Sequence, residues 1–193
     1  MIRFLDIVFS LFGLIILSPL LIILAVWVRL DSKGPVLYSQ VRVGLGGRDF
    51  KLLKFRSMRI NADKAGLLTV GGRDSRITNA GYYLRKYKLD ELSQLINVLF
   101  GDMSLVGPRP EVRKYVDLYT EAQKKVLNVR PGITDMASIA YKKENELLAG
   151  SPDPEKTYIE EIMPEKLKLN LIYIENPGIV NYFRIIFKTI FPF

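Results

Sequence analysis

Two adjacent carboxylates, Asp90 and Glu91, begin an apolar segment in the middle of the chain, and arginines lie on both sides of the pair. Arg85 precedes it, and Arg109 follows it in the Gly-Pro-Arg-Pro turn of residues 107–110. The prolines restrict the backbone around Arg109, so this turn presents its guanidinium group rigidly. Guanidinium groups bind phosphate oxygens through two parallel hydrogen bonds, while a carboxylate can attack phosphorus or bind a metal ion. Together these residues indicate chemistry on a phosphate ester.

Each of these acidic residues also has an ordinary structural explanation. The helix dipole stabilises acids in the first turn of a helix, so Asp90 and Glu91 alone would more often be capping residues than catalytic ones. Asp102 suits a turn-stabilising role as well as a metal-binding one. Function is favoured because the acidic pair and a rigid arginine occur within one short window.

Two further cations, Lys54 and Arg56, alternate about Phe55 in a strand-like segment. Side chains two residues apart on a strand share a face, so we expect both cations to point the same way. They join Arg85 and Arg109 as candidate phosphate contacts.

The motifs as a set resemble the bacterial sugar transferases, the small monotopic phosphoglycosyl transferases that start glycan assembly on a membrane. The resemblance runs in order along nearly the whole chain and departs from the family at two places. Ser93 stands where the family usually has proline, and the segment after Thr134 lacks a late Gly-Arg-Asn, with Lys142 near the position of that arginine. The matching segments are KFRSM (54–58), DSRIT (74–78), LR (84–85), LDEL (89–92), QL (94–95), NV (97–98), GDMSLVGPRP (101–110) and RPGIT (130–134).

The resemblance implies that Asp90 is a nucleophile that forms an acyl phosphate, with Glu91 as a metal ligand or as a base for the acceptor. It implies transfer of a sugar 1-phosphate from a UDP-sugar to polyprenyl (undecaprenyl) phosphate, with release of UMP. We expect Mg²⁺ at Asp90 and Glu91, because the charge of a pyrophosphate must be neutralised before a carboxylate can approach. The expected substrate contacts are Lys54, Arg56, Arg85, Pro108, Arg109 and Lys142. Lys142 would contact a phosphate through a single ammonium group, since lysine cannot reproduce the two parallel hydrogen bonds of an arginine.

Two alternatives remain open from the sequence. The same site could carry out direct one-step displacement without a covalent intermediate, or the chain could be a basic membrane-tethered scaffold without catalysis. The sequence does not reveal which sugar is transferred, which glycan is built, or whether the chain forms a homodimer.

Composition restricts the partners and the catalytic groups. The chain has 193 residues, a net charge of +8 and a pI of about 9.6, which favours anionic partners. Nucleic acid is not expected, because the basic residues form no long run and no nucleic-acid-binding signature occurs. Histidine and cysteine are absent, so catalysis must rest on carboxylates, lysines or tyrosines.

An uncharged run covers residues 7–28 and would measure about 33 Å as a helix, enough to cross a bilayer. Ser18 and Pro19 interrupt it, since proline removes one helical hydrogen bond and kinks the helix, while the serine hydroxyl can bond to a freed carbonyl. Flanking charges are similar at both ends, so the positive-inside rule gives no strong orientation. The resemblance implies a re-entrant helix-break-helix (residues 1–30) that carries a catalytic domain (residues 31–193) on the cytoplasmic face of the inner membrane.

A second membrane element is expected at residues 179–193, where apolar residues recur every three or four positions and Arg184 and Lys188 lie off the apolar stripe. Such a helix suits the surface of an anionic phospholipid membrane, although a helix facing the core would show the same period.

The remaining patterns predict one α+β domain that is mainly helical, with a short β-hairpin and interfacial amphipathic helices. Strand-like alternation at 36–43 and 50–55 flanks a glycine turn, and residues 59–76 suggest a mobile loop that covers the substrate. Helical periods occur at 79–88, 90–100 and 111–129, and a turn at 151–154 precedes a final pair of helices.

Overall fold

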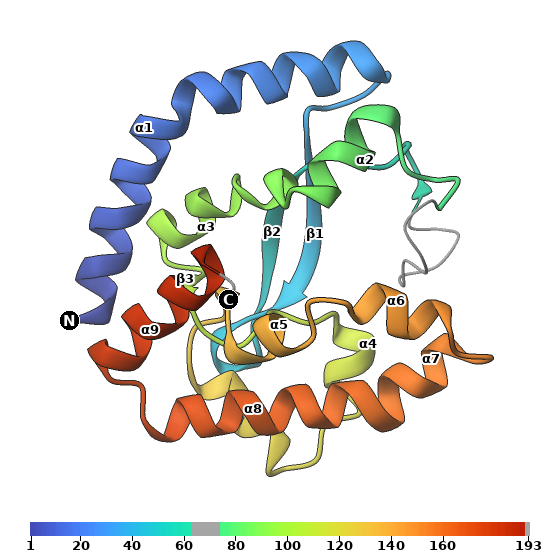
Figure 1. Ribbon diagram of the computed structural model, residues 1–193. Helices are drawn as coiled ribbons and strands as arrows, with labels where there is room; N and C mark the ends of the chain where they lie inside the picture. The colour runs from blue at the N-terminus through green and yellow to red at the C-terminus, as the bar shows by residue number, and fades with distance from the viewer. Residues whose placement is uncertain (63–73, 192–193) are drawn as a thin grey trace.

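The computed structural model describes residues 1–62 and 74–191 of this chain, and Figure 1 shows one mixed α+β domain with a long N-terminal helix along its edge. The elements are α1 (Ile2–Asp31), β1 (Leu37–Val43), β2 (Asp49–Phe55), α2 (Asn79–Lys86), α3 (Gln94–Phe100), β3 (Ser104–Val106), α4 (Arg113–Val116), β4 (Gly132–Thr134), α5 (Met136–Ala140), α6 (Glu144–Ala149), α7 (Pro154–Thr157), α8 (Met163–Glu175) and α9 (Ile179–Ile190). Short 3₁₀ turns lie at Leu45–Gly47, Leu89–Glu91 and Gln123–Asn128, and a π turn at Tyr158–Ile162 joins α7 to α8.

The predicted hairpin is confirmed. Strands β1 and β2 pair antiparallel from Leu37 opposite Phe55 to Val43 opposite Asp49. The reversal needs left-handed backbone at Gly46 and Gly47, whose φ angles are 65° and 74°, which glycine adopts without a steric cost.

A second, parallel strand pair fixes the Gly-Pro-Arg-Pro turn. Strand β3 pairs with β4 in the register Ser104 with Gly132 and Val106 with Thr134. Gly107 and Gly132 face each other so closely that a Cβ on Gly132 would lie 2.1 Å from the Gly107 nitrogen. Both positions therefore need glycine for close backbone approach, and the turn after Gly107 starts from a rigid base.

Helix α1 continues through Pro19 and bends instead of breaking, so the expected helix-break-helix is corrected to one bent helix (Figure 1). The bend keeps its hydrogen bonding because Ser18 Oγ donates to the Ile15 carbonyl at 2.7 Å, the carbonyl that Pro19 leaves without an amide partner. By length and composition the helix could cross a membrane, and little of its most apolar part is buried.

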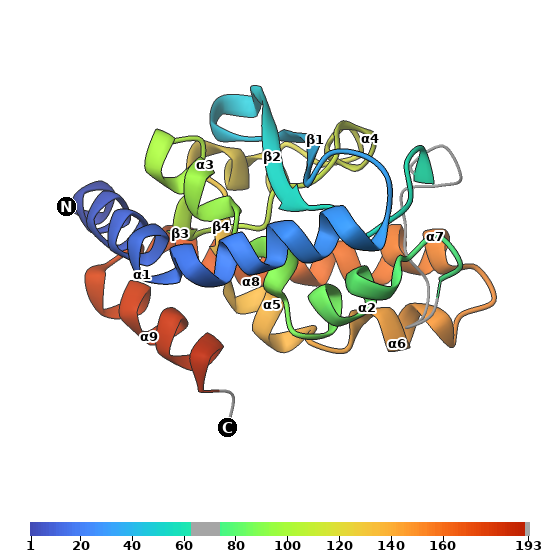
Figure 2. The same cartoon turned by 90° about the horizontal axis from the view of Figure 1, so that it is seen from above.

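Both halves of α1 contact the same domain. Near the N-terminus, Asp6 is buried and accepts hydrogen bonds from Ser104 Oγ at 3.0 Å and from Tyr182 Oη at 2.9 Å. Near the C-terminal end of α1, Leu24 and Val28 pack with buried residues of β2 and α2. Figure 2 shows α1 extending across one face of the domain with α9 beside its N-terminal half, where the rings of Phe9 and Phe183 meet edge to face at 6.0 Å.

The prediction of one amphipathic helix over 111–129 is wrong. Only α4 forms there, and the chain turns before the 3₁₀ segment Gln123–Asn128. The cause is a reciprocal cap: the Thr120 amide donates to Gln123 Oε1 at 2.9 Å, and the Gln123 amide donates to Thr120 Oγ1 at 3.3 Å. Such a capping box starts a new helical turn and so divides the apolar period in two.

The other helical predictions hold with shifted boundaries. Helix α2 begins at its cap Thr78, whose hydroxyl accepts from the Gly81 amide, and the final helices follow Asp153, which caps α7. The period expected at 90–100 divides into the 3₁₀ turn Leu89–Glu91 and α3. Most of the loop expected to cover the substrate, residues 63–73, lies outside the described residues.

The hydrophobic core consists of several clusters of buried residues between the helices and strands. Its largest cluster joins α4 and the segment after it to α8 through Tyr115, Val116, Tyr158, Met163 and Leu167.

Candidate active site

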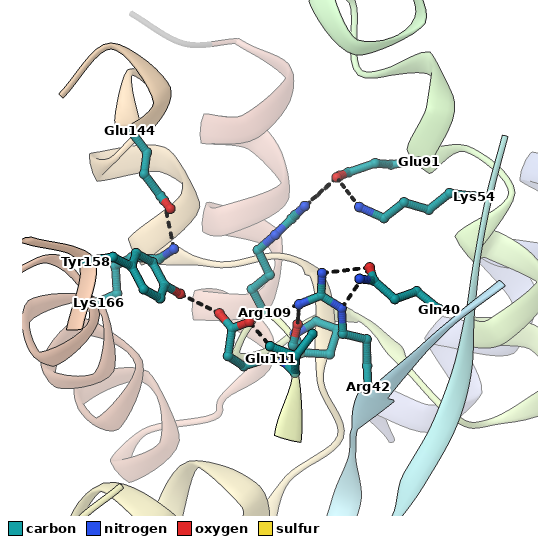
Figure 3. A network of polar contacts seen from close by, with 11 residues as sticks. Gln40, Arg42, Lys54, Glu91, Arg109, Glu111, Glu144, Tyr158 and Lys166 are labelled. Carbon is teal, nitrogen blue, oxygen red and sulfur yellow. Dashed lines mark hydrogen bonds and ion pairs between the residues drawn. The ribbon is translucent and has the colours of Figure 1, made fainter. Parts of the chain in front are cut away.

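The carboxylate of Glu91 forms ion pairs with two cations that come from distant parts of the chain (Figure 3). Lys54 on β2 approaches Glu91 Oε1 at 3.3 Å. Arg109 donates to both oxygens of the same carboxylate, with Nη1 at 3.3 Å from Oε2 and Nη2 in close contact with Oε1. The expected association of the acidic pair with Lys54 and Arg109 is therefore present in the fold.

These charges set the protonation of the cluster. Burial alone would raise the pKa of Glu91, but the charges of Arg109 and Lys54 outweigh it and hold the pKa well below its usual range. Burial lowers the pKa of Lys54 to about 8, even though Glu91 favours its charged form. Glu91 is thus an ionised carboxylate, while Lys54 titrates near neutral pH.

Asp90 has a different environment from its neighbour. It lies in the 3₁₀ turn before α3, not in the first turn of an α-helix, where the capping explanation would place it. It is buried, and no hydrogen bond to its carboxylate occurs within the described part of the chain. Burial raises the pKa of Asp90 and the charge of Glu91 adds to the rise, while Lys54, Arg85 and Lys88 oppose it. The pKa values of the two neighbouring acids are therefore shifted in opposite directions.

Backbone strain precedes the acidic pair. Lys88 has a φ of 58°, in the left-handed region that a non-glycine residue rarely adopts. This reversal separates α2 from the turn that carries Asp90, and it brings the exposed Lys88 near both acids, since its charge lowers the pKa of each. No motif or spacing in the sequence singles out Lys88.

The turn that carries Arg109 is held from two sides. On one side, buried Asp135 accepts from the Arg109 amide at 2.8 Å and from Asn170 Nδ2 at 3.1 Å, while it also caps α5. On the other side, Arg42 donates to the Pro110 carbonyl at 3.3 Å. Pro108 is buried, and its carbonyl accepts from the Gly132 amide at 3.0 Å, which makes its role one of shaping the turn.

A polar network extends from this turn into the domain (Figure 3). Arg42 donates to Gln40 Oε1 at 2.8 Å and to Glu111 Oε1 at 2.9 Å, and Tyr158 donates to the other oxygen of Glu111. Sequence reasoning missed Arg42, Glu111 and Asp135, because the contacts that connect them to the site and to the core join residues distant in the chain. The adjacency of Glu111 to the Pro-Arg-Pro turn was the one local signal.

Arg56 does not join the cluster, and the expectation that it shares a face with Lys54 at the site is corrected. Its guanidinium group is buried and donates to the carbonyl oxygens of Val28, Ser32 and Lys33 at 3.2, 2.6 and 3.0 Å. Val28 lies in the last turn of α1, whose carbonyls lack helical partners, and Ser32 and Lys33 follow the helix directly. The helix dipole also favours a cation at this end. Arg56 therefore fastens the end of α1 to β2.

The remaining predicted residues lie in three different settings. Arg85 is half-buried on α2, and its charge lowers the pKa of Asp90, so it lies near the acidic pair. Lys142 is exposed in the segment after α5, where it lines a hollow with residues of α9. Asp102 accepts from Asn97 Nδ2 at 3.3 Å, which favours the turn-stabilising interpretation.

Metal binding would depend on few protein ligands. Within residues 1–62 and 74–191, no group of three or more His, Cys, Asp or Glu side chains could hold a metal ion. The oxygens of Glu91 receive three hydrogen bonds from Lys54 and Arg109, which leaves the Asp90 carboxylate as the less engaged of the pair. This donor set suits Mg²⁺, which takes one or two carboxylates and completes its shell with water and phosphate oxygens.

Comparison with known proteins finds relatives that are named as sugar phosphate transferases. The chain is 38% identical over 191 residues to a UDP-N-acetylgalactosamine-undecaprenyl-phosphate N-acetylgalactosaminephosphotransferase of Aeromonas hydrophila, covering 97% of this chain and 42% of the relative. It is 37% identical over 190 residues to a UDP-glucose:undecaprenyl-phosphate glucose-1-phosphate transferase of Klebsiella pneumoniae, covering 96% of this chain and 38% of that relative. A putative undecaprenyl-phosphate N-acetylgalactosaminyl 1-phosphate transferase of Bacillus subtilis is 45% identical over 132 residues, which cover 68% of this chain and 70% of the relative.

The chain thus spans about two-fifths of the length of the first two relatives. The model of the family described as "Bacterial sugar transferase" matches residues 1–193. This chain therefore belongs to the bacterial sugar transferase family.

Proposed function

We propose that this chain transfers a sugar 1-phosphate from a UDP-sugar to polyprenyl phosphate and releases UMP. The observation that carries the proposal is the contrast within one turn between Asp90, which is buried without a hydrogen-bond partner in the described structure, and Glu91, which pairs with Arg109 and Lys54. Relatives named as UDP-glucose:undecaprenyl-phosphate glucose-1-phosphate transferases support the choice of substrates.

The chemistry proceeds in two displacements at the phosphorus that carries the sugar. A carboxylate oxygen of Asp90 attacks this phosphorus, a bond from Asp90 to phosphorus forms, and UMP leaves with the bridging oxygen and its electron pair. A phosphate oxygen of the lipid then attacks the same phosphorus. This breaks the bond to Asp90 and yields the sugar diphosphate lipid with a regenerated carboxylate.

The surrounding cations make the first displacement feasible. A desolvated carboxylate is a stronger nucleophile than a hydrated one, but it must approach a pyrophosphate that is itself negative. Lys54, Arg85 and Lys88 supply positive charge around Asp90. The fork of Arg109, which pairs with Glu91, suits two phosphate oxygens once the substrate competes for it. Mg²⁺ held by Asp90, Glu91 and the phosphates would neutralise part of the pyrophosphate charge when bound.

The membrane arrangement suits a substrate pair of one soluble nucleotide and one lipid. The outer face of α1 exposes apolar side chains including Phe12, Ile16 and Ile23, and both halves of the helix lie on the same domain. We infer that α1 enters and leaves one leaflet of an anionic phospholipid membrane, with the domain on the cytoplasmic side where UDP-sugars are made.

A mass measurement tests the covalent step. After incubation with a panel of UDP-sugars without lipid acceptor, the protein is expected to gain the mass of one sugar phosphate, mapped by peptide analysis to Asp90. The matched control is Asp90→Asn, which keeps the shape of the side chain and should neither form the adduct nor turn over. Turnover by Asp90→Asn would refute the assignment, while turnover of the parent with no adduct, under rapid quenching, would favour direct one-step displacement.

A further inference from the structure

A hollow lies between α9 and the segment after α5, and none of the residues that line it takes part in the ion pairs of Glu91. Its volume is about 770 Å³, within the range of small-molecule sites. One part of its lining is aromatic, from Phe183, Phe187 and Phe191, and the other is cationic.

The cationic part consists of Lys142, Arg184 and Lys188. Arg184 and Lys188 are one helical turn apart on α9, so they project from the same side of the helix, and Lys142 comes from the segment after α5. No ion pair or hydrogen bond joins these three side chains to another described residue, and no carboxylate lines the hollow. Three uncompensated cations beside an aromatic wall match an amphiphile with an anionic end.

The position of the hollow connects it both to the membrane anchor and to the active site. Phe183 meets Phe9 of α1 at 6.0 Å, so the aromatic wall continues from the apolar face of the anchor. On the opposite side of α9, Thr189 shares a 2.7 Å hydrogen bond with Thr134, whose carbonyl accepts from the Gly107 amide at 3.0 Å. The strand pair that bears the Arg109 turn therefore also supports α9.

We propose that this hollow, called the groove below, holds the phosphate end and the first apolar units of the isoprenoid lipid phosphate before the phosphate reaches Asp90. The identity of this lipid acceptor rests on the proposed function. A terminal phosphate monoester carries close to two negative charges at neutral pH, which suits three cations better than the single charge of a phospholipid diester. The aromatic wall receives the chain where it leaves the bilayer.

Binding and turnover are measured separately to test this. The groove variant is Arg184→Gln/Lys188→Gln. The control is Lys124→Gln/Lys125→Gln, which also removes two exposed positive charges, but from the Gln123–Asn128 turn, which does not line the hollow. In steady-state assays with saturating UDP-sugar, the groove variant is expected to raise the KM for polyprenyl phosphate about tenfold, as for loss of charge-assisted hydrogen bonds. Its KM for UDP-sugar and the kinetics of the control should stay within about twofold of the parent, and Arg184→Lys/Lys188→Arg should restore most of the affinity.

Binding without turnover distinguishes failure of the groove from failure of the proposed reaction. In the Asp90→Asn background, ³¹P NMR titration in zwitterionic nanodiscs should show polyprenyl phosphate binding that the groove variant weakens, with little binding of phosphatidylglycerol. Equal binding of the two lipids would mean unspecific attraction to anionic membranes and would overturn the proposal, as would unchanged binding in the groove variant. Loss of binding in the groove variant combined with no turnover by the parent would retain the groove and refute the reaction.

Discussion

Replacement of Arg109 tests whether this residue binds the substrate or only pairs with Glu91. Arg109→Gln removes a fork that donates to both oxygens of Glu91, whose side chain is 12% exposed, against 35% for Arg109. Charge-assisted hydrogen bonds contribute about 1.5–3 kcal/mol to stability, and the partial exposure of Arg109 places the loss in the lower part of that range. Loss of one preorganised donor to the transition state costs about 100- to 1000-fold in kcat.

A double-mutant cycle separates these two effects. The kcat/KM for UMP release and the free energy of unfolding in denaturant are measured for Arg109→Gln, Glu91→Gln and the double variant, with Arg109→Lys as the variant that keeps charge but loses the fork. If Arg109 contacts the phosphates, the double variant should be about 100-fold slower than Glu91→Gln alone. Equal rates of the double variant and Glu91→Gln would refute the phosphate contact and leave Arg109 as the partner that orients Glu91.

Three further predictions follow from the anchor and the cluster. The pKa of Lys54 is lowered to about 8, so activity that needs its charge should fall as the pH rises through about 8, and Lys54→Arg should shift this fall in rate to higher pH. Between about pH 8 and the ordinary lysine pKa the unfolded chain binds more protons at Lys54 than the folded chain does. Lys54 should therefore make the free energy of unfolding rise with pH in that interval. A chelator should stop turnover and Mg²⁺ should restore it, so full activity in excess chelator would contradict metal dependence. Ser18→Leu/Pro19→Ala should straighten α1, and a cysteine placed at position 2 should then react with an impermeant reagent outside intact cells, whereas outside labelling of the unstraightened chain would refute the re-entrant arrangement.

Local chemistry accounts for the elements that the sequence predicted. The hairpin follows from alternating residues on both sides of a glycine turn, and α2 follows from Thr78 before a helical period. The same reasoning failed over 111–129, because the apolar period continues across Thr120 while its side chain and that of Gln123 end one helical segment and begin another. The capping signature was visible in the sequence, and it outweighed the hydrophobic period.

The sequence predicted the site residues that lie within one motif with a rigid backbone. It did not predict contacts of side chains whose partners lie far away in the sequence. Glu91 and Arg109 were expected together because the motif contains both. Arg56 lies two residues from Lys54, yet its guanidinium group binds the carbonyls at the end of α1. These carbonyls lack helical partners, and hydrogen bonds to them decide the direction of the Arg56 side chain more than the alternation along the strand does. The supports Arg42 and Asp135 act across 68 and 26 residues of sequence, a distance that no periodicity conveys.

The buried carboxylate of Asp6 also has a consequence for biosynthesis. Helix α1 is synthesised before β1 and the elements that follow it, but two groups that satisfy Asp6 are Ser104 and Tyr182, which lie 98 and 176 residues later in the chain. At ordinary translation rates of 5–20 residues per second, the second partner arrives roughly 10–35 s after the aspartate. Until both residues have been made, the Asp6 carboxylate lacks its full set of hydrogen-bond donors. Hydrocarbon excludes such a carboxylate, so the first turns of the helix must stay in the aqueous or head-group layer. The first turns of α1 can therefore be seated only after α9 has been made, which makes the seating of this helix a late step in the assembly of the domain.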